Sequence, residues 1–199
     1  RNADRMMYGE KLFRQHSRCN EVVQSLREAL AARDHITEGH ASRLGELAVA
    51  VAKHIDSPVE SLGDLRLLAE FHDVGKIGIP DRILNKPGRL DAQEWEEMRK
   101  HSEIGYRIAQ ATPTLQPIAS FILHHHEWWN GEGYPLGLAG EDIPLACRIL
   151  SIVDAYDAMT NDRPYRKAMC REEAMAELKK GAGRQFDARL VAAFEEVLQ

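Results

Sequence analysis

Residues 62–80 form the stretch LGDLRLLAEFHDVGKIGIP, in which a run of apolar residues leads directly into a histidine and an aspartate. The apolar residues of its first half lie at helical spacing: Leu62, Leu65, Leu68, Ala69 and Phe71. Gly75 and Pro80 disfavour continuation of a helix and predict that a loop follows. The stretch therefore predicts a helix that delivers His72 and Asp73 at its end.

Helical periodicity continues on both sides of this stretch. Upstream, an amphipathic pattern contains Leu44, Leu47, Ala48, Val51, Ala52 and Ile55. Ser57-Pro58 breaks this pattern. Downstream, Asp91 and Glu94 resemble a capping box at the start of one helix. That helix is predicted to end at Thr112-Pro113 and to carry Trp95, Met98, His101, Ile104 and Ile108.

The remaining part of the chain is also predicted to be helical. Further helices are expected around residues 118–125, around Asp154, at 171–180 and at 187–198, the last with Asp187 as its N-cap. No stretch alternates polar and apolar residues as a strand does, and no internal repeat is found. The sequence predicts an all-α helical bundle that carries its polar site residues on helix ends and adjoining loops.

The N-terminal segment differs in composition from the rest. Residues 5–33 are polar and helix-favouring, contain no proline, and place apolar residues between Val22 and Leu30 at helical spacing. This pattern fits a helix packed on the main domain or a connector from an upstream domain, and such a helix could pair two chains into a homodimer. Because the chain begins at Arg1 without a signal peptide, we expect it to be a fragment of a longer protein.

Composition limits the class of protein. A length of 199 residues and an apolar fraction of 44% suffice for one full domain and an appendage. No apolar run approaches the roughly 20 residues of a membrane span, so no membrane contact is expected. A net charge of −5 argues against a nucleic-acid polymer as partner. Cys19, Cys147 and Cys170 share no close spacing, which predicts free thiols and a cytoplasmic location.

Residues that commonly bind metal ions are concentrated in and around two short motifs. These are HDVGK at residues 72–76 and HHEWWNGEGYP at residues 125–135. The candidate ligands are His40, His72, Asp73, His101, His125, His126 and Asp154. They suffice for two divalent metals, because imidazole suits Fe, Mn, Zn or Ni and a carboxylate can bridge a pair. A lone helical histidine is more often hydrogen-bonded or exposed, so this prediction rests on the whole set.

The motifs and their order resemble those of the HD-GYP family, bacterial phosphodiesterases of the HD superfamily that hydrolyse cyclic dinucleotides. The resemblance extends from about residue 34 to the C-terminus. It implies an all-α HD-superfamily helical bundle, with a catalytic domain at residues 34–199 and a connector helix at residues 1–33. In the family such helices often join an upstream sensory or receiver domain to the catalytic domain.

The resemblance also implies a dinuclear metal site bridged by Asp73. One ion would be held by His40, His72, Asp73 and Asp154, and the other by Asp73, His101, His125 and His126. Fe or Mn is the expected metal, with Ni, Co and Zn as alternatives. Some family members bind a third metal through a glutamate four residues before the first histidine ligand. This chain has Ile36 there, so we expect two metals.

Other residues are implied to act on the substrate. Asp73 and Lys76 are the expected catalytic residues, and the ammonium group of Lys76 suits contact with a phosphate. Arg163 and Arg166 are expected to grip phosphate oxygens, which guanidinium groups bind in bidentate fashion. The phosphate-binding role of Arg163 and Arg166 is implied by the family. Without the resemblance, the charged residues around Arg163 would be interpreted as part of the protein surface.

The glycine-rich loop at residues 131–135 is expected to border the site. In the family the tyrosine, Tyr134 here, can meet the ligand. The loop can also contact diguanylate cyclase domains, so such a domain is an expected partner. Trp128 and Trp129 could stack on a guanine base, but large aromatic residues more often pack in a core.

These features predict a metal-dependent phosphodiesterase that hydrolyses cyclic di-GMP, or a related 3′,3′-cyclic dinucleotide, to linear pGpG, GMP or both. The nucleophile would be a metal-activated hydroxide. An alternative is a cyclic dinucleotide receptor or interaction module with little or no turnover. A different HD-superfamily hydrolase, such as a nucleotidase, would leave His101, the His125-His126 pair and the Gly-Tyr-Pro loop unexplained.

Overall fold

The computed structural model of the chain describes residues 21–33, 39–56, 62–162 and 167–199. A first helix spans residues 21–33. In chain order it is followed by α2 (His40–His54), α3 (Leu62–Phe71), the 3₁₀ helix η1 (Val74–Gly78), α4 (Asp81–Leu84), α5 (Ala92–Arg99), α6 (His101–Ala111), η2 (Gln116–Ile118), α7 (Ala119–His124), η3 (Gly140–Asp142), α8 (Leu145–Thr160), α9 (Arg171–Gly181) and α10 (Ala188–Val197). No strand occurs among these residues, which confirms the predicted all-α class.

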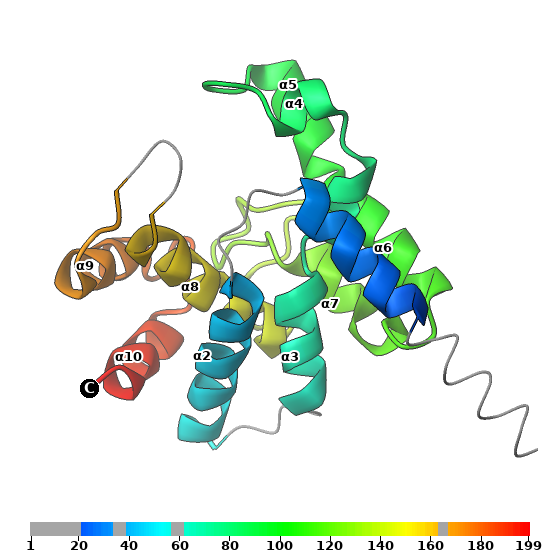
Figure 1. The fold of residues 1–199 in the computed structure, drawn as a ribbon. Helices are drawn as coiled ribbons and strands as arrows, with labels where there is room; N and C mark the ends of the chain where they lie inside the picture. The colour runs from blue at the N-terminus through cyan, green and yellow to red at the C-terminus, as the bar shows by residue number, and fades with distance from the viewer. Residues whose placement is uncertain (1–20, 34–38, 57–61, 163–166) are drawn as a thin grey trace, which may run out of the picture.

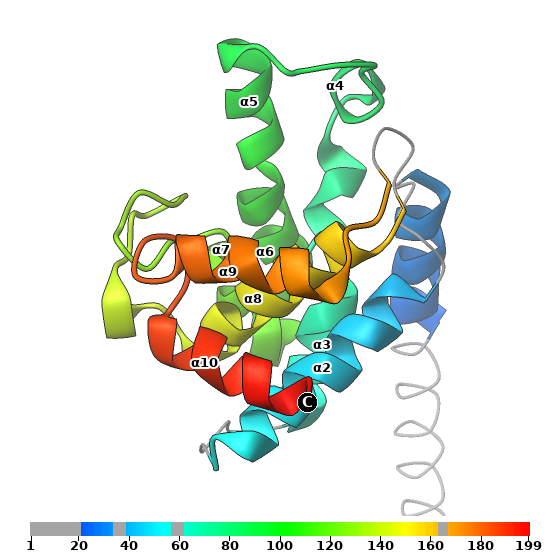
Figure 2. The same ribbon diagram turned by 90° about the vertical axis from the view of Figure 1, so that its left-hand side faces the viewer.

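The core lies where α2, α3, α7 and α8 meet. Leu44 of α2, Leu65 of α3, Ile122 of α7 and Ile149 of α8 are fully buried in one cluster. The helices α9 and α10 pack on α8, and α10 also contacts α2 (Figure 2). Burial of these apolar faces is the main force that holds the helices together.

A projection formed by α4 and α5 extends away from this core (Figure 1). Helix α5 has no buried residue. It begins with the predicted capping box, because the Glu94 amide donates to Asp91 and the Asp91 amide donates to the Glu94 carboxylate, both at 2.9 Å. The predicted N-cap of α10 is also present, since the Arg189 amide donates to Asp187 at 2.9 Å.

The single helix predicted from Asp91 through Ile108 is interrupted at Lys100, between α5 and α6. The Lys100 amide donates to the carbonyl three residues earlier, in a tighter turn than an α-helix. The side chains of His101 and Ser102 donate to carbonyl groups in the last turn of α5, at 2.7 and 2.8 Å. Such side-chain bonds compete with the backbone ladder, which explains the break.

The helix at residues 21–33 is attached to the loop that follows the His-Asp pair. Val23 and Leu30 are buried, and Arg27 forms an ion pair with Glu70 of α3. The guanidinium of Arg33 donates to the carbonyl of Ile79 at 2.7 Å and also binds Asp81. The rest of the predicted 5–33 helix lies outside the described residues. Among the described helices, none has the length and apolar composition that a membrane span requires.

Candidate metal centre

The seven predicted ligands come together from separate elements of the fold. They lie at the start of α2, at the ends of α3 and α7, at the start of α6, and within α8. Asp73, His101, His125 and His126 form one group, and His40, His72 and Asp154 form another. Within each group, one potential ligand atom per residue lies within 4.8 Å of every other. The resemblance implied the same division of the histidines, with Asp73 shared between the two sets.

Asp73 lies between the two groups. Its Oδ1 atom is 3.5 Å from Nε2 of His101 and 3.9 Å from Nε2 of His125. Its Oδ2 atom faces the other way, 3.3 Å from Nε2 of His72 and 2.8 Å from Nζ of Lys76. Because its two oxygen atoms face different histidines, the carboxylate could bridge two cations if both groups held one.

Three of the histidines are held in the same way. The Nδ1 atom of His72 lies 3.1 Å from the Ala69 carbonyl, and that of His125 lies 2.6 Å from the Ile122 carbonyl. His101 makes the equivalent bond to the carbonyl three residues before it, at 2.7 Å. A carbonyl only accepts, so each Nδ1 carries a hydrogen, and each Nε2 faces the centre, where it can bind a cation when it holds no proton. This is how metal-binding histidines are held.

The Nε2 atoms are crowded in a way that fits a shared cation. Nε2 of His101 is 3.3 Å from that of His125 and 3.1 Å from that of His126. His101 and His125 are buried, and one ring nitrogen from each of the three histidines lies within 4.8 Å of the others. Three nitrogen lone pairs and a carboxylate suit a divalent transition metal.

The buried cluster shifts the pKa values of its members in different directions. Burial would raise the pKa of Asp73, but the attraction of Lys76 and His72 holds it well below its usual range. Burial would lower the pKa of His72, but the charge and hydrogen bond of Asp73 raise it to about 9. Burial and repulsion from a neighbouring histidine lower the pKa of His126 to about 3. A cation that binds at His72 takes the place of its proton.

The fourth histidine, His40, has a different partner. Its Nδ1 atom lies 2.6 Å from Oδ2 of Asp157, and its Nε2 atom lies 3.7 Å from Oδ1 of Asp154. Asp157 is buried and also binds Arg43. The sequence analysis did not single out Asp157 or Arg43. The available signal was spacing, because each follows a predicted ligand by three residues on the same helix.

Gly75 allows the turn after Asp73 to lie directly against α6. A Cβ atom at this position would lie 1.8 Å from the His101 carbonyl oxygen and 2.5 Å from the Gly105 amide nitrogen. Only a residue without a side chain permits this approach. The contact places the start of α6, and with it His101, beside Asp73.

The predicted glycine-rich loop borders the centre. The ring of Tyr134 stacks on that of His126, with the centroids 4.8 Å apart and the planes at 27°. The guanidinium of Arg99 lies 5.2 Å from the centroid of the Tyr134 ring. Buried Glu127 accepts hydrogen bonds from the amides of Leu136 and Leu138, at 2.8 and 3.0 Å. These bonds hold the loop beside His126.

The two tryptophans pack against arginine side chains. The guanidinium of Arg184 lies 5.8 Å from the ring centroid of Trp128, and that of Arg148 lies 5.7 Å from Trp129. The Trp129 amide donates to the Gln185 carbonyl at 3.1 Å. This arrangement favours the packing role over stacking on a base.

The other predicted positions lie elsewhere or outside the described residues. His54, which belongs to neither motif, pairs with Glu196 at the surface. His124 directly precedes the His125-His126 pair, and its buried ring nitrogens have no hydrogen-bond partner among the described residues. Arg163, Arg166 and Ile36 lie outside the described residues, so their predicted roles stay predictions.

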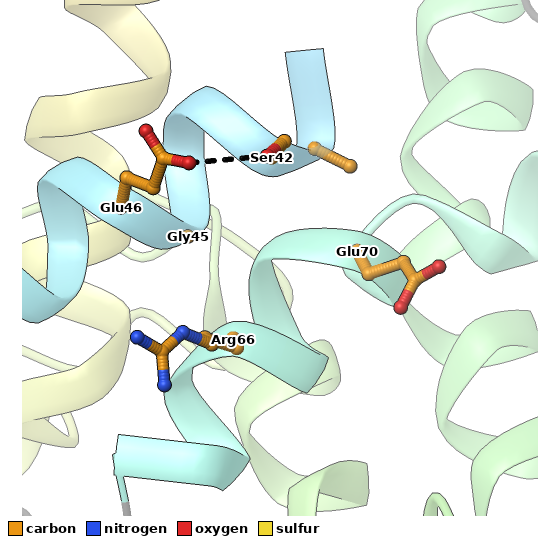
Figure 3. Close-up of a pocket in the computed structure, with 6 residues that line it drawn as sticks. Ser42, Gly45, Glu46, Arg66 and Glu70 are labelled. Atoms are coloured by element: carbon orange, nitrogen blue, oxygen red, sulfur yellow. Dashed lines mark hydrogen bonds between the residues drawn. The ribbon is translucent and has the colours of Figure 1, made fainter. Parts of the chain in front are cut away.

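A hollow of about 350 Å³ lies between α2 and α3 (Figure 3). It is lined by Ala41, Ser42, Gly45, Glu46, Arg66 and Glu70. None of the predicted metal ligands lines it. It is therefore separate from the metal centre.

Comparison with known proteins agrees with the sequence motifs. The profile of the HD domain family matches residues 24–190. A cyclic di-GMP phosphodiesterase of Thermotoga maritima is 39% identical over 176 residues, covering 87% of this chain and 48% of the relative. A 3′3′-cGAMP-specific phosphodiesterase of Vibrio cholerae is 40% identical over 174 residues, covering 86% of this chain and 33% of the relative. The chain thus spans half or less of these relatives.

A solved structure of a cyclic GMP-AMP-specific phosphodiesterase from V. cholerae has the same fold. It superposes with a TM-score of 0.69 at 21% identity, covering 89% of this chain and 48% of that one. The family profile covers most of the chain and includes both motifs. The chain therefore belongs to the HD domain family, and the resemblance to its HD-GYP members is confirmed.

Proposed function

We propose that this chain is a metal-dependent phosphodiesterase domain that hydrolyses cyclic di-GMP to linear pGpG, GMP or both. The observation that carries the proposal is the position of Asp73 between two groups of ligand atoms, with one carboxylate oxygen toward each. The similarity to cyclic dinucleotide phosphodiesterases supports the substrate class.

The residues of the centre have separable tasks. His101, His125, His126 and Asp73 would hold one ion, while His40, His72, Asp154 and Asp73 would hold the other. Two bound divalent ions, Fe or Mn in this proposal, supply a nucleophile at neutral pH and neutralise charge on the phosphate. The backbone hydrogen bonds of the histidines keep Nε2 directed at the centre, which reduces the cost of assembling the site.

We assign Lys76 to the scissile phosphate. Its Nζ atom lies 2.8 Å from Asp73, and its side chain is mostly buried. The ammonium group is therefore held at the metal centre, where a phosphodiester would bind. We assign Arg163 and Arg166 to other phosphate oxygens and Tyr134 to the rim of the substrate site.

Lys76→Met is expected to retain both metals while kcat/KM for cyclic di-GMP falls by about 10- to 100-fold, the value of one lost charge-assisted hydrogen bond. Metal analysis and steady-state kinetics check this result. Lys86→Met is the matched control, because Lys86 forms an ion pair with Glu94 at 2.5 Å on the α4–α5 projection. Loss of metal from Lys76→Met would instead indicate that the lysine stabilises Asp73.

The substrate is tested by presenting the Mn(II)-loaded chain with cyclic di-GMP, 3′,3′-cGAMP and cyclic di-AMP at equal concentrations. Chromatography resolves the products. We expect cyclic di-GMP to be hydrolysed with the highest kcat/KM. Preference for 3′,3′-cGAMP would correct the substrate but keep the reaction. Tight binding without turnover of any of the three would favour a receptor.

The wider context is part of the proposal. The relatives extend well beyond the matched region, so we propose an upstream sensory or receiver domain that the 1–33 segment connects to the 34–199 catalytic domain. A homodimer through the N-terminal helix and contact of the Gly-Tyr-Pro loop with a diguanylate cyclase domain belong to the same proposal. We place the protein in the cytoplasm, where such signalling nucleotides are made.

A further inference from the structure

His40 is the member of the centre whose Nδ1 atom faces a carboxylate. Its partner Asp157 accepts at 2.6 Å, whereas His72, His101 and His125 donate to backbone carbonyls. Both His40 and Asp157 are buried, with 5% and 3% of their surface exposed. A buried carboxylate makes a stronger hydrogen bond to an imidazole N–H than a neutral carbonyl does.

Asp157 is itself held by other donors. Nε of Arg43 donates to Oδ1 at 2.6 Å, and Nη2 of Arg43 donates to Oδ2 at 3.1 Å. The side-chain amide of Asn161 donates to Oδ1 at 2.9 Å. With His40, four donors face two oxygen atoms. The carboxylate can therefore only accept, and the Nδ1 atom of His40 must carry the hydrogen.

Both ring nitrogens of His40 face aspartates of the same helix, α8. Asp154 and Asp157 lie one turn apart on α8, and Asp154 faces Nε2 while Asp157 holds Nδ1. Arg43 and His40 lie one turn apart on α2. The cluster thus joins α2 to α8 at the metal centre and sets the direction of one ligand.

We propose that Asp157, clamped by Arg43 and Asn161, is a positioning residue that fixes the tautomer and direction of His40 for the ion at His40, His72 and Asp154. This inference rests on the proposed dinuclear centre and deepens it. It predicts that loss of the Asp157 charge weakens one of the two metal positions selectively.

Asp157→Asn tests the proposal with little change in shape. If the NH₂ group of the new amide faces His40, it donates to Nδ1 and favours the tautomer with the hydrogen on Nε2, and that Nε2 cannot bind a metal. If the amide is rotated so that its oxygen faces His40, the NH₂ group faces the donors of Arg43 and Asn161 instead. We expect one of two Mn(II) equivalents to bind about 10- to 100-fold more weakly, the usual cost of losing such an outer partner. The other equivalent should bind as in the wild type.

Asp187→Asn is the matched control. Asp187 is also buried, and it pairs with Arg148 at 3.0 Å, but its contacts lie at the start of α10. This variant should lose thermal stability while it binds two equivalents with wild-type affinity. A purely structural role for Asp157 would make the two variants alike.

The experiment is a titration of the metal-stripped full chain with Mn(II). Calorimetry measures the affinity of each equivalent, and electron paramagnetic resonance detects whether the bound ions are coupled. The resonance of a coupled ion pair in the wild type should change to that of isolated Mn(II) in Asp157→Asn at two added equivalents. If Asp157→Asn binds two equivalents with unchanged affinity, the positioning role of Asp157 is wrong but the dinuclear centre still stands. A wild-type chain that binds only one equivalent would overturn the dinuclear centre and this inference together.

If Asp157→Asn fails to fold, Arg43→Gln provides a second test of the same metal position. It leaves the carboxylate and the Asn161 hydrogen bond in place but removes the two Arg43 donors, and the Arg43 side chain is about one-third exposed. We expect a smaller loss at the same metal position, about 3- to 10-fold, because Asp157 then holds His40 less firmly. Wild-type affinity at both positions in Arg43→Gln would contradict the clamp.

Discussion

Asp73→Ala is expected to remove both metals and to lower kcat/KM for cyclic di-GMP by more than about 10³-fold, since bound metal ions supply several kcal/mol of transition-state stabilisation. Asp73 is the residue whose two carboxylate oxygens face different histidine groups. Its loss removes the shared ligand and one of the two carboxylate charges among the seven candidate ligands. Elemental analysis and product chromatography measure the two effects.

Asp142→Ala is the control for this substitution, because Asp142 is an exposed acid on η3. It should keep wild-type metal content and rate. An Asp73→Ala chain that retains both metals and turns over substrate would contradict the bridging role. An Asp73→Ala chain that loses only one equivalent would show that the carboxylate belongs to one position.

Gly75→Ala is expected to lower the free energy of unfolding by about 3–5 kcal/mol, at the upper end of the cost of overpacking. The added Cβ would lie 1.8 Å from the His101 carbonyl oxygen and 2.5 Å from the Gly105 amide nitrogen, and both are backbone atoms. A flexible side chain could move aside, but here α6 itself must shift. His101 would move with it, so metal affinity should fall as well.

Gly45→Ala is the matched control within α2. Its nearest neighbour would be Cγ of Arg66 at 3.6 Å, an ordinary contact. Because alanine favours a helix over glycine by about 0.5–1 kcal/mol, this variant should be as stable as the wild type or slightly more stable. Denaturant unfolding of both variants measures the difference. Equal stability of Gly75→Ala and Gly45→Ala would contradict the close approach of η1 to α6.

Much of the fold could be predicted from local signals in the chain. Apolar residues at helical spacing, the Asp91–Glu94 capping box and the Asp187 N-cap all correspond to features of the structure. These signals act within one or two turns, so the sequence carries them directly. The break at Lys100 was not predicted, because it depends on where the side chains of His101 and Ser102 donate.

That the seven candidate ligands cluster could be expected, because the chemistry restricts which residues can bind a metal. His72-Asp73 and His125-His126 stand out as pairs, and the family order joined His40, His101 and Asp154 to them. The residues that bond to His40 and to its partner Asp157 were not predictable in the same way. Asp157 and Arg43 look like ordinary charged helix residues until α2 and α8 are packed together. The need for glycine at position 75 likewise depends on a contact with a distant segment.

The measurement that tests the central claim most directly is the rate of cyclic di-GMP hydrolysis as Mn(II) is added anaerobically to the metal-stripped chain. The dinuclear phosphodiesterase predicts no turnover without metal, a rise that follows the second equivalent, and a plateau at two equivalents. The product should be linear pGpG or GMP, and a chelator should abolish its formation. Intact substrate at full metal loading, or full turnover at one equivalent, would contradict the account.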